Sequence, residues 1–245
     1  MARIDFTTRR FFTPEPLAPN TRIEPGRGEA NHVLNVLRMG DGDPLLLFNG
    51  RDGEWRATVN REGRKKATFL VGQQIREQPE LPTLRLLYAP LKQARLEYMV
   101  QKAVEMGTGH LQPVLTQYTQ MRKVNVERME THVIEAAQQC GVLSLPEVYE
   151  PASLKTAVAE CGTVIFCDEA EAGTAGALNT LQNLSIAAPL AVLIGPEGGF
   201  SPDEREWLHG HDHVHSIPLG PRILRADTAA VAALALVQAT MGDWS

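Results

Sequence analysis

Short apolar runs characterise the start of the chain. Runs of the length typical of strands occur at residues 44–48, 55–60 and 67–71. Residues 29–39 differ, because their apolar positions recur at the spacing of a helix. Several short strands with one helix indicate a small barrel.

From residue 84 onward, the pattern changes to strands that alternate with helices. We predict strands that cover residues 84–88, 111–115, 164–167 and 191–194, and a last strand that ends at Ile217. We predict helices at residues 93–106, 126–140, 202–207 and 229–239. This alternation indicates a parallel α/β sheet. Residues 74–83 are polar, contain two prolines and are typical of a linker. We therefore expect two domains, at residues 1–73 and 84–245.

A glycine-rich loop follows the predicted strand 191–194. It contains the sequence Ile194-Gly195-Pro196-Glu197-Gly198-Gly199, and its glycines allow backbone angles that other residues avoid. Ser201 and Glu204 have the spacing of a capping box, which predicts a helix from about Pro202. A loop at the carboxyl end of a buried strand is where open α/β sheets bind ligands. The alternative is a plain tight turn between strand and helix.

A second stretch repeats this design. It reads Leu219-Gly220-Pro221-Arg222-Ile223-Leu224-Arg225-Ala226-Asp227-Thr228-Ala229. Asp227 or Thr228 is suited to cap a helix over residues 229–239. That helix is almost entirely Ala, Val and Leu, so we expect it to be buried on most sides.

Charge divides unevenly along the chain. The net charge is −5 over 245 residues, but residues 1–73 carry +3 and the remainder −8. A basic N-terminal part indicates an anionic partner, although a charge of +3 is also compatible with simple scatter. Hydrophobic residues make up 43%, as in ordinary soluble proteins.

Several classes of protein are not indicated. No apolar run approaches the roughly 20 residues of a membrane span, and charged residues interrupt the N-terminus where a signal peptide would be apolar. Three cysteines without a Cys-x-x-Cys pair fit a reduced, cytoplasmic setting. Alternating histidines at 209, 211, 213 and 215 could hold a metal. No further ligand completes such a site, so we predict that the protein binds no metal. From the absence of a long apolar run we also predict no membrane association.

The two loops together resemble the signature of the SPOUT-class methyltransferases. In detail they resemble the bacterial family that methylates N3 of uridine 1498 in 16S ribosomal RNA (the RsmE family), with Asp227 where Glu is usual. Gln101-Lys102-Ala103-Val104-Glu105-Met106-Gly107 is similar to a helix of that family, and residues 32–38 with Gly42-Asp43 resemble its PUA-like RNA-binding domain. The chain departs from the family pattern near Gln117 and at residues 138–142.

The resemblance implies a fold and a cofactor. The expected fold is α/β: a C-terminal SPOUT domain with a parallel sheet and a trefoil knot, preceded by a small PUA-like β-barrel domain. The expected cofactor is S-adenosylmethionine, which carries its own electrophilic methyl group and needs no metal. The residues expected to bind it are Ile194, Gly195, Pro196, Glu197, Gly198, Gly199, Leu219, Gly220, Ile223, Leu224 and Ala226.

The resemblance also implies partners and roles for charged residues. The expected partners are 16S ribosomal RNA or the small ribosomal subunit, and a second copy of the chain in a homodimer. Arg225 is the candidate catalytic cation, because a positive charge would stabilise the uridine anion; a salt bridge to Asp227 or Glu197 is the alternative. Arg9, Arg10 and Arg38 are candidates to contact RNA phosphates, or else are solvated surface charges.

Two other functions stay open on the sequence alone. The chain could be a SPOUT methyltransferase that acts on another RNA, such as a tRNA ribose or base. It could also be an RNA-binding factor that keeps the fold without catalysis.

Overall fold

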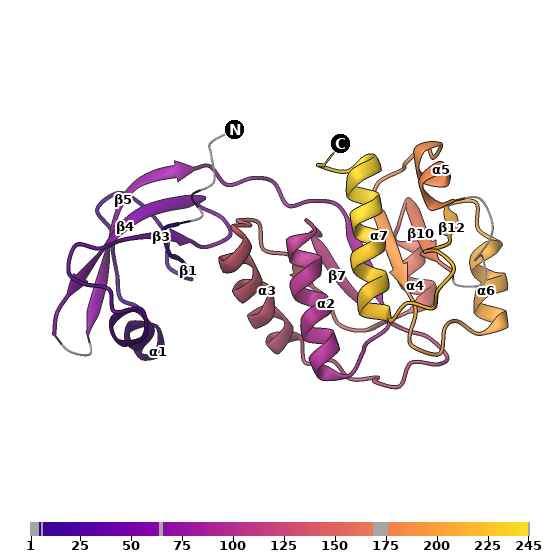
Figure 1. Ribbon diagram of the computed structural model, residues 1–245, viewed down its shortest axis with the longest axis horizontal. Coiled ribbons are helices and arrows are strands. Elements are labelled where there is room, and N and C mark those ends of the chain that lie inside the picture. Colours follow the sequence, from indigo (N-terminus) through magenta and orange to yellow (C-terminus); the bar gives the residue numbers. More distant parts are fainter. Residues whose placement is uncertain (1–4, 6, 64–65, 169–175, 245) are drawn as a thin grey trace. The chain divides into compact units, whose positions relative to one another are not determined.

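The computed structural model describes residues 5, 7–63, 66–168 and 176–244 (Figure 1). The chain forms two compact units. The first consists of Met1–Glu80 together with Ala137–Leu145, and the second of Leu81–Ala136 and Pro146–Ser245. No sequence signal marks the grouping of residues 137–145 with the N-terminal unit.

The first unit contains a five-stranded sheet. Its strand order is β1-β3-β4-β5-β2, from Arg10–Phe12, Pro44–Phe48, Glu54–Arg61, Ala67–Arg76 and Arg22–Ile23. β1 runs parallel to β3, and the other neighbours are antiparallel. The predicted strands at 44–48, 55–60 and 67–71 are confirmed. β1 and β2 are too short to show a period in the sequence.

Two predictions for this unit need adjustment. β5 continues to Arg76, which pairs with Glu54 of β4, so the strand enters the segment that was expected to be a linker. The helix predicted at 29–39 is two short helices, α1 at Arg27–Asn31 and the π-helix η1 at His32–Val36. It ends early because Arg38 takes a left-handed conformation with φ of 57°, which helices do not continue through.

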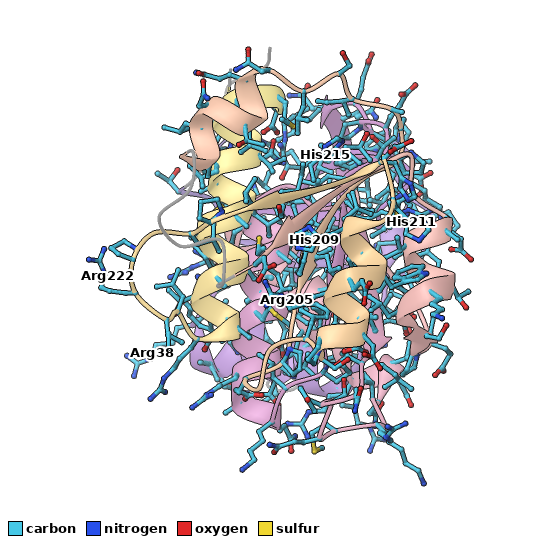
Figure 2. The ribbon with its side chains drawn as sticks, turned by 90° about the vertical axis from the view of Figure 1, so that its right-hand side faces the viewer. Arg38, Arg205, His209, His211, His215 and Arg222 are labelled. Atoms are coloured by element: carbon cyan, nitrogen blue, oxygen red, sulfur yellow. The ribbon has the colours of Figure 1, made fainter. Side chains whose placement is uncertain are left out.

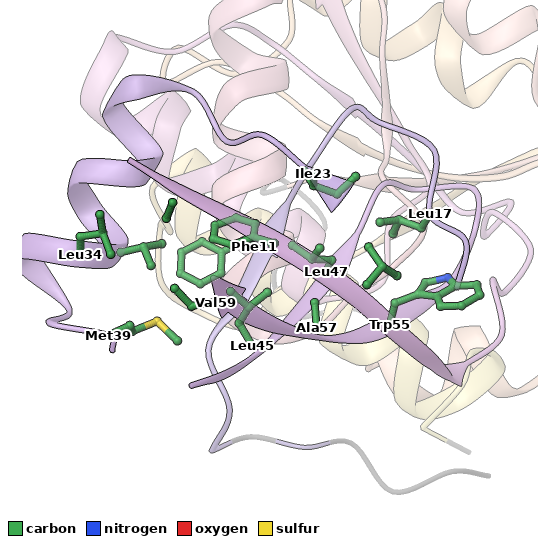
Figure 3. Close-up of a cluster of buried hydrophobic side chains, with 14 residues drawn as sticks. Phe11, Leu17, Ile23, Leu34, Met39, Leu45, Leu47, Trp55, Ala57 and Val59 are labelled. Carbon is green, nitrogen blue, oxygen red and sulfur yellow. The ribbon is translucent and has the colours of Figure 1, made fainter. Parts of the chain in front are cut away.

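A continuous apolar core holds the first unit together. Both faces of β3 are buried, and side chains of η1 pack against the sheet. Figure 3 shows this cluster, which includes Phe11, Val33, Leu47, Trp55, Val59 and Phe69. Burying one large apolar side chain stabilises the fold by about 1.5–3 kcal/mol, so the cluster makes the short strands collectively stable.

The second unit is built on a parallel sheet, as predicted. The order is β12-β10-β11-β6-β7-β8, with β9 beside β7, and every pairing is parallel. The strands are Arg85–Tyr88 (β6), His110–Leu115 (β7), Glu147–Val148 (β8), Ala152–Ser153 (β9), Thr163–Cys167 (β10), Leu190–Ile194 (β11) and Val214–Ile217 (β12). Threading of the C-terminal segment through a knot stays a prediction.

Helices cover this sheet. α4 (Leu154–Ala159) and α6 (Pro202–His209) contribute Leu154 and Leu208 to a core with Phe166 and Leu193 of the strands. α7 (Ala226–Met241) packs beside α2 (Gln93–Glu105), where Gln238 Nε2 donates to Met106 O at 2.6 Å (Figure 1). The remaining helices are α3 (Val126–Cys140) and α5 (Ala177–Gln182).

The helix boundaries test the capping signals. α3 has the predicted bounds, and α2 ends before Gly107, which has φ of 74°. α6 begins at Pro202 with both hydrogen bonds of the predicted capping box, Glu204 N to Ser201 Oγ and Ser201 N to Glu204 Oε2.

The predicted cap of the last helix was wrong. α7 begins at Ala226 with Arg225 at the cap position, and no described side chain caps it. Asp227 lies inside the first turn instead, where its negative charge is favourable to the helix dipole. Buried Ala226 extends the apolar stripe toward the N-terminus, so packing rather than capping sets the start. Within the described ranges, none of the helices has the length and apolarity required of a membrane span.

Candidate active site at the carboxyl edge of the parallel sheet

The carboxyl ends of three neighbouring strands meet at one edge of the second unit's sheet. β10 lies between β11 and β12, and the three strands run parallel. Asp168 follows β10 directly, loop 195–200 follows β11, and loop 218–225 follows β12. Open α/β sheets bind ligands outside the carboxyl ends of their strands, so this edge is the place to look for a site.

The glycine loop after β11 is shaped by contacts that exclude side chains. Gly199 has φ of 69°, and its N–H donates to Pro196 O at 2.9 Å, closing a tight turn. At Gly195, an added Cβ would lie 2.6 Å from Cε2 of the Phe200 ring. The ring therefore packs directly against the main chain, which requires glycine at this position.

The loop after β12 is more exposed. Gly220 has φ of 93°, and an added Cβ there would meet no described atom within 4 Å. Ile223 is 92% exposed, which is unusual for a large apolar side chain, whereas Ala226 at the start of α7 is buried. The loop thus presents an apolar side chain outward while its end is anchored by a helix.

A pocket of about 90 Å³ lies between these two loops and the end of β10. It brings together every residue that the sequence predicted for the cofactor except Gly198. It also includes residues that sequence reasoning missed. The described residues that line it are Cys167, Asp168, Ile194, Gly195, Pro196, Glu197, Gly199, Leu219, Gly220, Arg222, Ile223, Leu224, Ala226 and Ala229.

Gly198 lies outside the described lining of the pocket. A Cβ at Gly198 would lie 3.4 Å from Cβ of Tyr118, at ordinary contact distance. Gly198 therefore contacts the loop after β7, and its neighbour Gly199 lies against the pocket.

Asp168 is the most buried charged residue of the lining. Its side chain is 1% exposed, and its Oδ2 accepts hydrogen bonds from Arg205 Nη2 at 2.9 Å and Nε at 3.1 Å. His209 Nε2 lies 3.2 Å from the same oxygen. Figure 2 shows Arg205 and His209 along α6. A buried carboxylate normally requires such partners. The only sequence signal for Asp168 is its position directly after a buried strand.

Arg225 lies beside the pocket, on its exterior. It is exposed at the start of α7 and is not among the described residues that line the pocket. The alternative reading as a salt bridge to Glu197 is not seen in the described part of the chain, because Glu197 Oε1 instead pairs with Arg95 Nη1 at 3.3 Å. Arg222, labelled in Figure 2 on the loop after β12, does line the pocket and gives the described lining a cation.

Cys167 lines the pocket, whereas His211 and His213 precede β12, at the amino end of that strand. Burial raises the pKa of the Cys167 thiol, so this side chain lines the pocket as an apolar group rather than as a thiolate. The His211 ring packs against Trp207, with centroids 4.4 Å apart, and lies 5.5 Å from the His213 ring. Among the described residues, no group of three or more His, Cys, Asp or Glu side chains is arranged to hold a metal ion.

The three arginines predicted to contact RNA have different places in the first unit. Arg9 and Arg38 are exposed. The Arg10 side chain is only 4% exposed and forms an ion pair with Glu54, which is fully buried and also accepts from Arg76 Nε at 2.7 Å. A phosphate contact by Arg10 would require breaking that pair, so its place argues against the predicted RNA contact and indicates a structural role.

Comparison with known proteins agrees with the fold and the loops. The family model described as RNA methyltransferase domain matches residues 78–238, and the model described as RNA methyltransferase PUA domain matches residues 25–71. Together, the parallel sheet with its two loops and the N-terminal PUA domain define an RNA methyltransferase.

Individual relatives narrow this class. The ribosomal RNA small subunit methyltransferase E of Rickettsia conorii is 33% identical over 94% of both chains. A solved methyltransferase structure from Legionella pneumophila, which contains the bound cofactor SAM, is 30% identical with a TM-score of 0.81 and covers 95% of this chain and 97% of its own. The ribosomal RNA small subunit methyltransferase E of Neisseria gonorrhoeae shares the fold at 24% identity, a TM-score of 0.82, and coverage of 97% and 100%. The chain belongs to the ribosomal RNA small subunit methyltransferase E family.

Proposed function

We propose that this protein transfers the methyl group of S-adenosylmethionine to N3 of a uridine in the 16S RNA of the small ribosomal subunit. The family resemblance implies that the target is uridine 1498. The observation that carries the proposal is the pocket at the carboxyl edge of the sheet, which gathers two distant glycine-containing loops around one cavity. The Legionella relative, solved with SAM bound, supports the choice of cofactor.

The chemistry of the lining suits this cofactor. Main-chain groups of the two loops can bind an adenine edge and a ribose without side chains, which fits the glycines at 195, 199 and 220. Asp168 and Glu197 place two carboxylates on the lining, each already paired with an arginine of a neighbouring helix. The protein has to hold methyl donor and acceptor close together and in line.

The methyl acceptor needs a cation. Uridine N3 becomes nucleophilic when it loses its proton to solvent; its lone pair then forms the new N–C bond as the C–S bond breaks, and S-adenosylhomocysteine leaves. Negative charge spreads onto the uracil oxygens before the transfer. Arg225 is the proposed stabiliser of that charge, because it is exposed at the rim of the pocket and remains protonated at any working pH.

The first unit is proposed to hold the RNA. It contains the exposed residues Arg9 and Arg38, and its sequence region carries a net positive charge. With ribosomal RNA as the substrate, we expect the protein to act in the cytoplasm.

A homodimer is proposed from the surface of α7. Its inner face is buried within the chain, and the opposite face carries half-buried apolar side chains, among them Val231, Ala232, Ala235 and Leu236. A second copy of the chain that packs on this face would remove it from water.

A methyl-transfer assay tests the target. Purified protein is incubated with labelled S-adenosylmethionine and either small ribosomal subunits that lack the modification or total tRNA, and the RNA is digested to nucleosides. We expect label in 3-methyluridine from the small subunit only. Label in tRNA, or on ribose, would establish the alternative RNA target. Calorimetry with S-adenosylmethionine alone tests cofactor binding. If no heat of binding were measured, the alternative of a non-catalytic RNA-binding factor would be favoured.

A further inference from the structure

A second cavity lies along the same edge of the sheet. It has a volume of about 290 Å³ and lies between α2, residues 121–125 and the first half of α3, all within the second unit. None of the described residues lines both this cavity and the cofactor pocket. Its apolar lining residues are Leu91, Leu96, Val100, Met121, Val124 and Met129, and its polar lining residues include Gln93, Glu97, Lys123, Asn125, Arg128 and His132. We name it the α2–α3 cavity.

One wall of the α2–α3 cavity is a network of polar groups. Arg128 Nη2 donates to Glu97 Oε1 at 2.6 Å, and Arg128 N donates to Asn125 Oδ1 at 2.9 Å. His132 Nε2 is buried and has no hydrogen-bond partner among the described residues, although Glu97 Oε1 lies 3.5 Å away. A buried ring nitrogen without a hydrogen bond is unfavourable, and a polar ligand in the cavity would satisfy it.

The rim of the α2–α3 cavity is positively charged. Glu97 is paired with Arg128, so its negative charge is largely offset. Lys123 lines the cavity and is exposed, and neither Lys123 nor its exposed neighbour Arg122 forms an ion pair with a described residue. The cavity thus combines an apolar floor, a polar wall and a cation at its opening.

An ion pair joins α2, the helix that forms one side of the α2–α3 cavity, to the glycine loop. Arg95, on α2 between the lining residues Gln93 and Leu96, pairs with Glu197 of the cofactor pocket. β6 and β7 end at this edge just before α2 and the segment that leads to residue 121. A chain-like substrate at the cofactor pocket would therefore pass this opening.

We propose that the α2–α3 cavity receives an unstacked nucleotide of the RNA substrate, a neighbour of the one that is methylated. The base lies on the apolar floor and bonds the polar wall, and a backbone phosphate contacts Lys123. RNA-binding proteins commonly read such splayed bases in pockets. A separate nucleotide is required because the two cavities have different linings. This proposal rests on the proposed function, since it assumes an RNA that is methylated at the cofactor pocket.

Filling the cavity tests this proposal. Leu96 is half-buried on the floor, so Leu96→Trp occupies the space of the base, and Leu178→Trp on α5 is the matched control at an exposed apolar position. Affinity for 16S RNA in small ribosomal subunits is measured by filter binding, which needs no turnover. We expect Leu96→Trp to weaken binding on the order of tenfold, the size of one lost base contact, and Leu178→Trp to stay within about twofold of wild type. Equal affinities for the two variants would overturn the proposal.

A second pair of variants does not depend on tolerance of the bulky side chain. Lys123→Gln should lower the slope of log affinity against log salt by about 0.7, the value for one phosphate of a single strand. Arg122→Gln, next to it but outside the described lining, is the control and should change the slope less. Equal changes would indicate a diffuse basic surface and would also overturn the proposal.

Calorimetry with S-adenosylmethionine separates this proposal from the proposed function. Each variant should bind the cofactor as wild type does. If the wild-type protein bound no cofactor, the proposed function itself would fail. If cofactor binding were intact and the cavity variants bound RNA normally, only the role of the α2–α3 cavity as a nucleotide site would be excluded, and the proposed function would stand.

Discussion

Gly195→Ala changes one atom at the centre of the glycine loop. The new Cβ would lie 2.6, 3.0 and 3.3 Å from Cε2, Cδ2 and Cζ of Phe200, whereas carbon atoms pack at about 3.5–4.0 Å. The ring would have to move by about 1 Å to restore contact distance. It has little room, because Phe200 is buried and its ring meets Phe166 edge-on at 5.0 Å.

The expected cost follows from overpacking. Forcing an extra carbon into a well-packed site costs about 1–3 kcal/mol, which for a chain of this length corresponds to a fall in Tm of about 2–12 °C. Displacement of Phe200 also moves the loop that lines the pocket. We therefore expect Gly195→Ala to bind S-adenosylmethionine more weakly in calorimetry.

Gly198→Ala, three residues along the same loop, is the control. Its Cβ would meet Tyr118 at 3.4 Å, and its φ is not in the left-handed region. We expect a change within about 0.5 kcal/mol and near-normal cofactor affinity. If Gly198→Ala lost as much stability and affinity as Gly195→Ala, the packing argument at Gly195 would be refuted.

Three further predictions concern charges and assembly. Arg225→Ala should lose on the order of a hundred- to a thousandfold in turnover while its affinity for the cofactor changes little. Higher pH should restore part of the rate, because more uridine ionises without help. Parallel losses of cofactor affinity and rate would instead place Arg225 in the cofactor site. Glu54→Gln leaves two largely buried arginines without their counter-charge and should lower the free energy of unfolding, measured with denaturant, by about 3–5 kcal/mol. A decrease of less than about 1 kcal/mol would contradict the structural role of this cluster. Light scattering should show a dimer, and a single species of 26.9 kDa at micromolar concentration would count against the proposed interface on α7.

Much of the second unit could be predicted from the sequence, because its signals are local. The apolar runs of β6, β7, β10 and β11 alternate with helices, and this alternation indicates a parallel sheet. The capping box of Ser201 and Glu204 set the start of α6, and Gly107 set the end of α2. These signals depend on a few neighbouring residues, so they survive into the folded chain. The start of α7 was not predicted correctly, because tertiary packing of Ala226 outweighed the capping preference of Asp227.

The loops of the pocket were identified from glycine positions and family resemblance, but their complete surroundings depend on the fold. Asp168 and Cys167 join the lining because β10 lies between β11 and β12, an order that no local pattern encodes. The same holds for the ion pair of Arg10 and Glu54, whose residues are far apart in sequence but adjacent in the first unit. An arginine in a sequence indicates a cation, and only the tertiary structure decides whether a buried carboxylate or the solvent lies beside it.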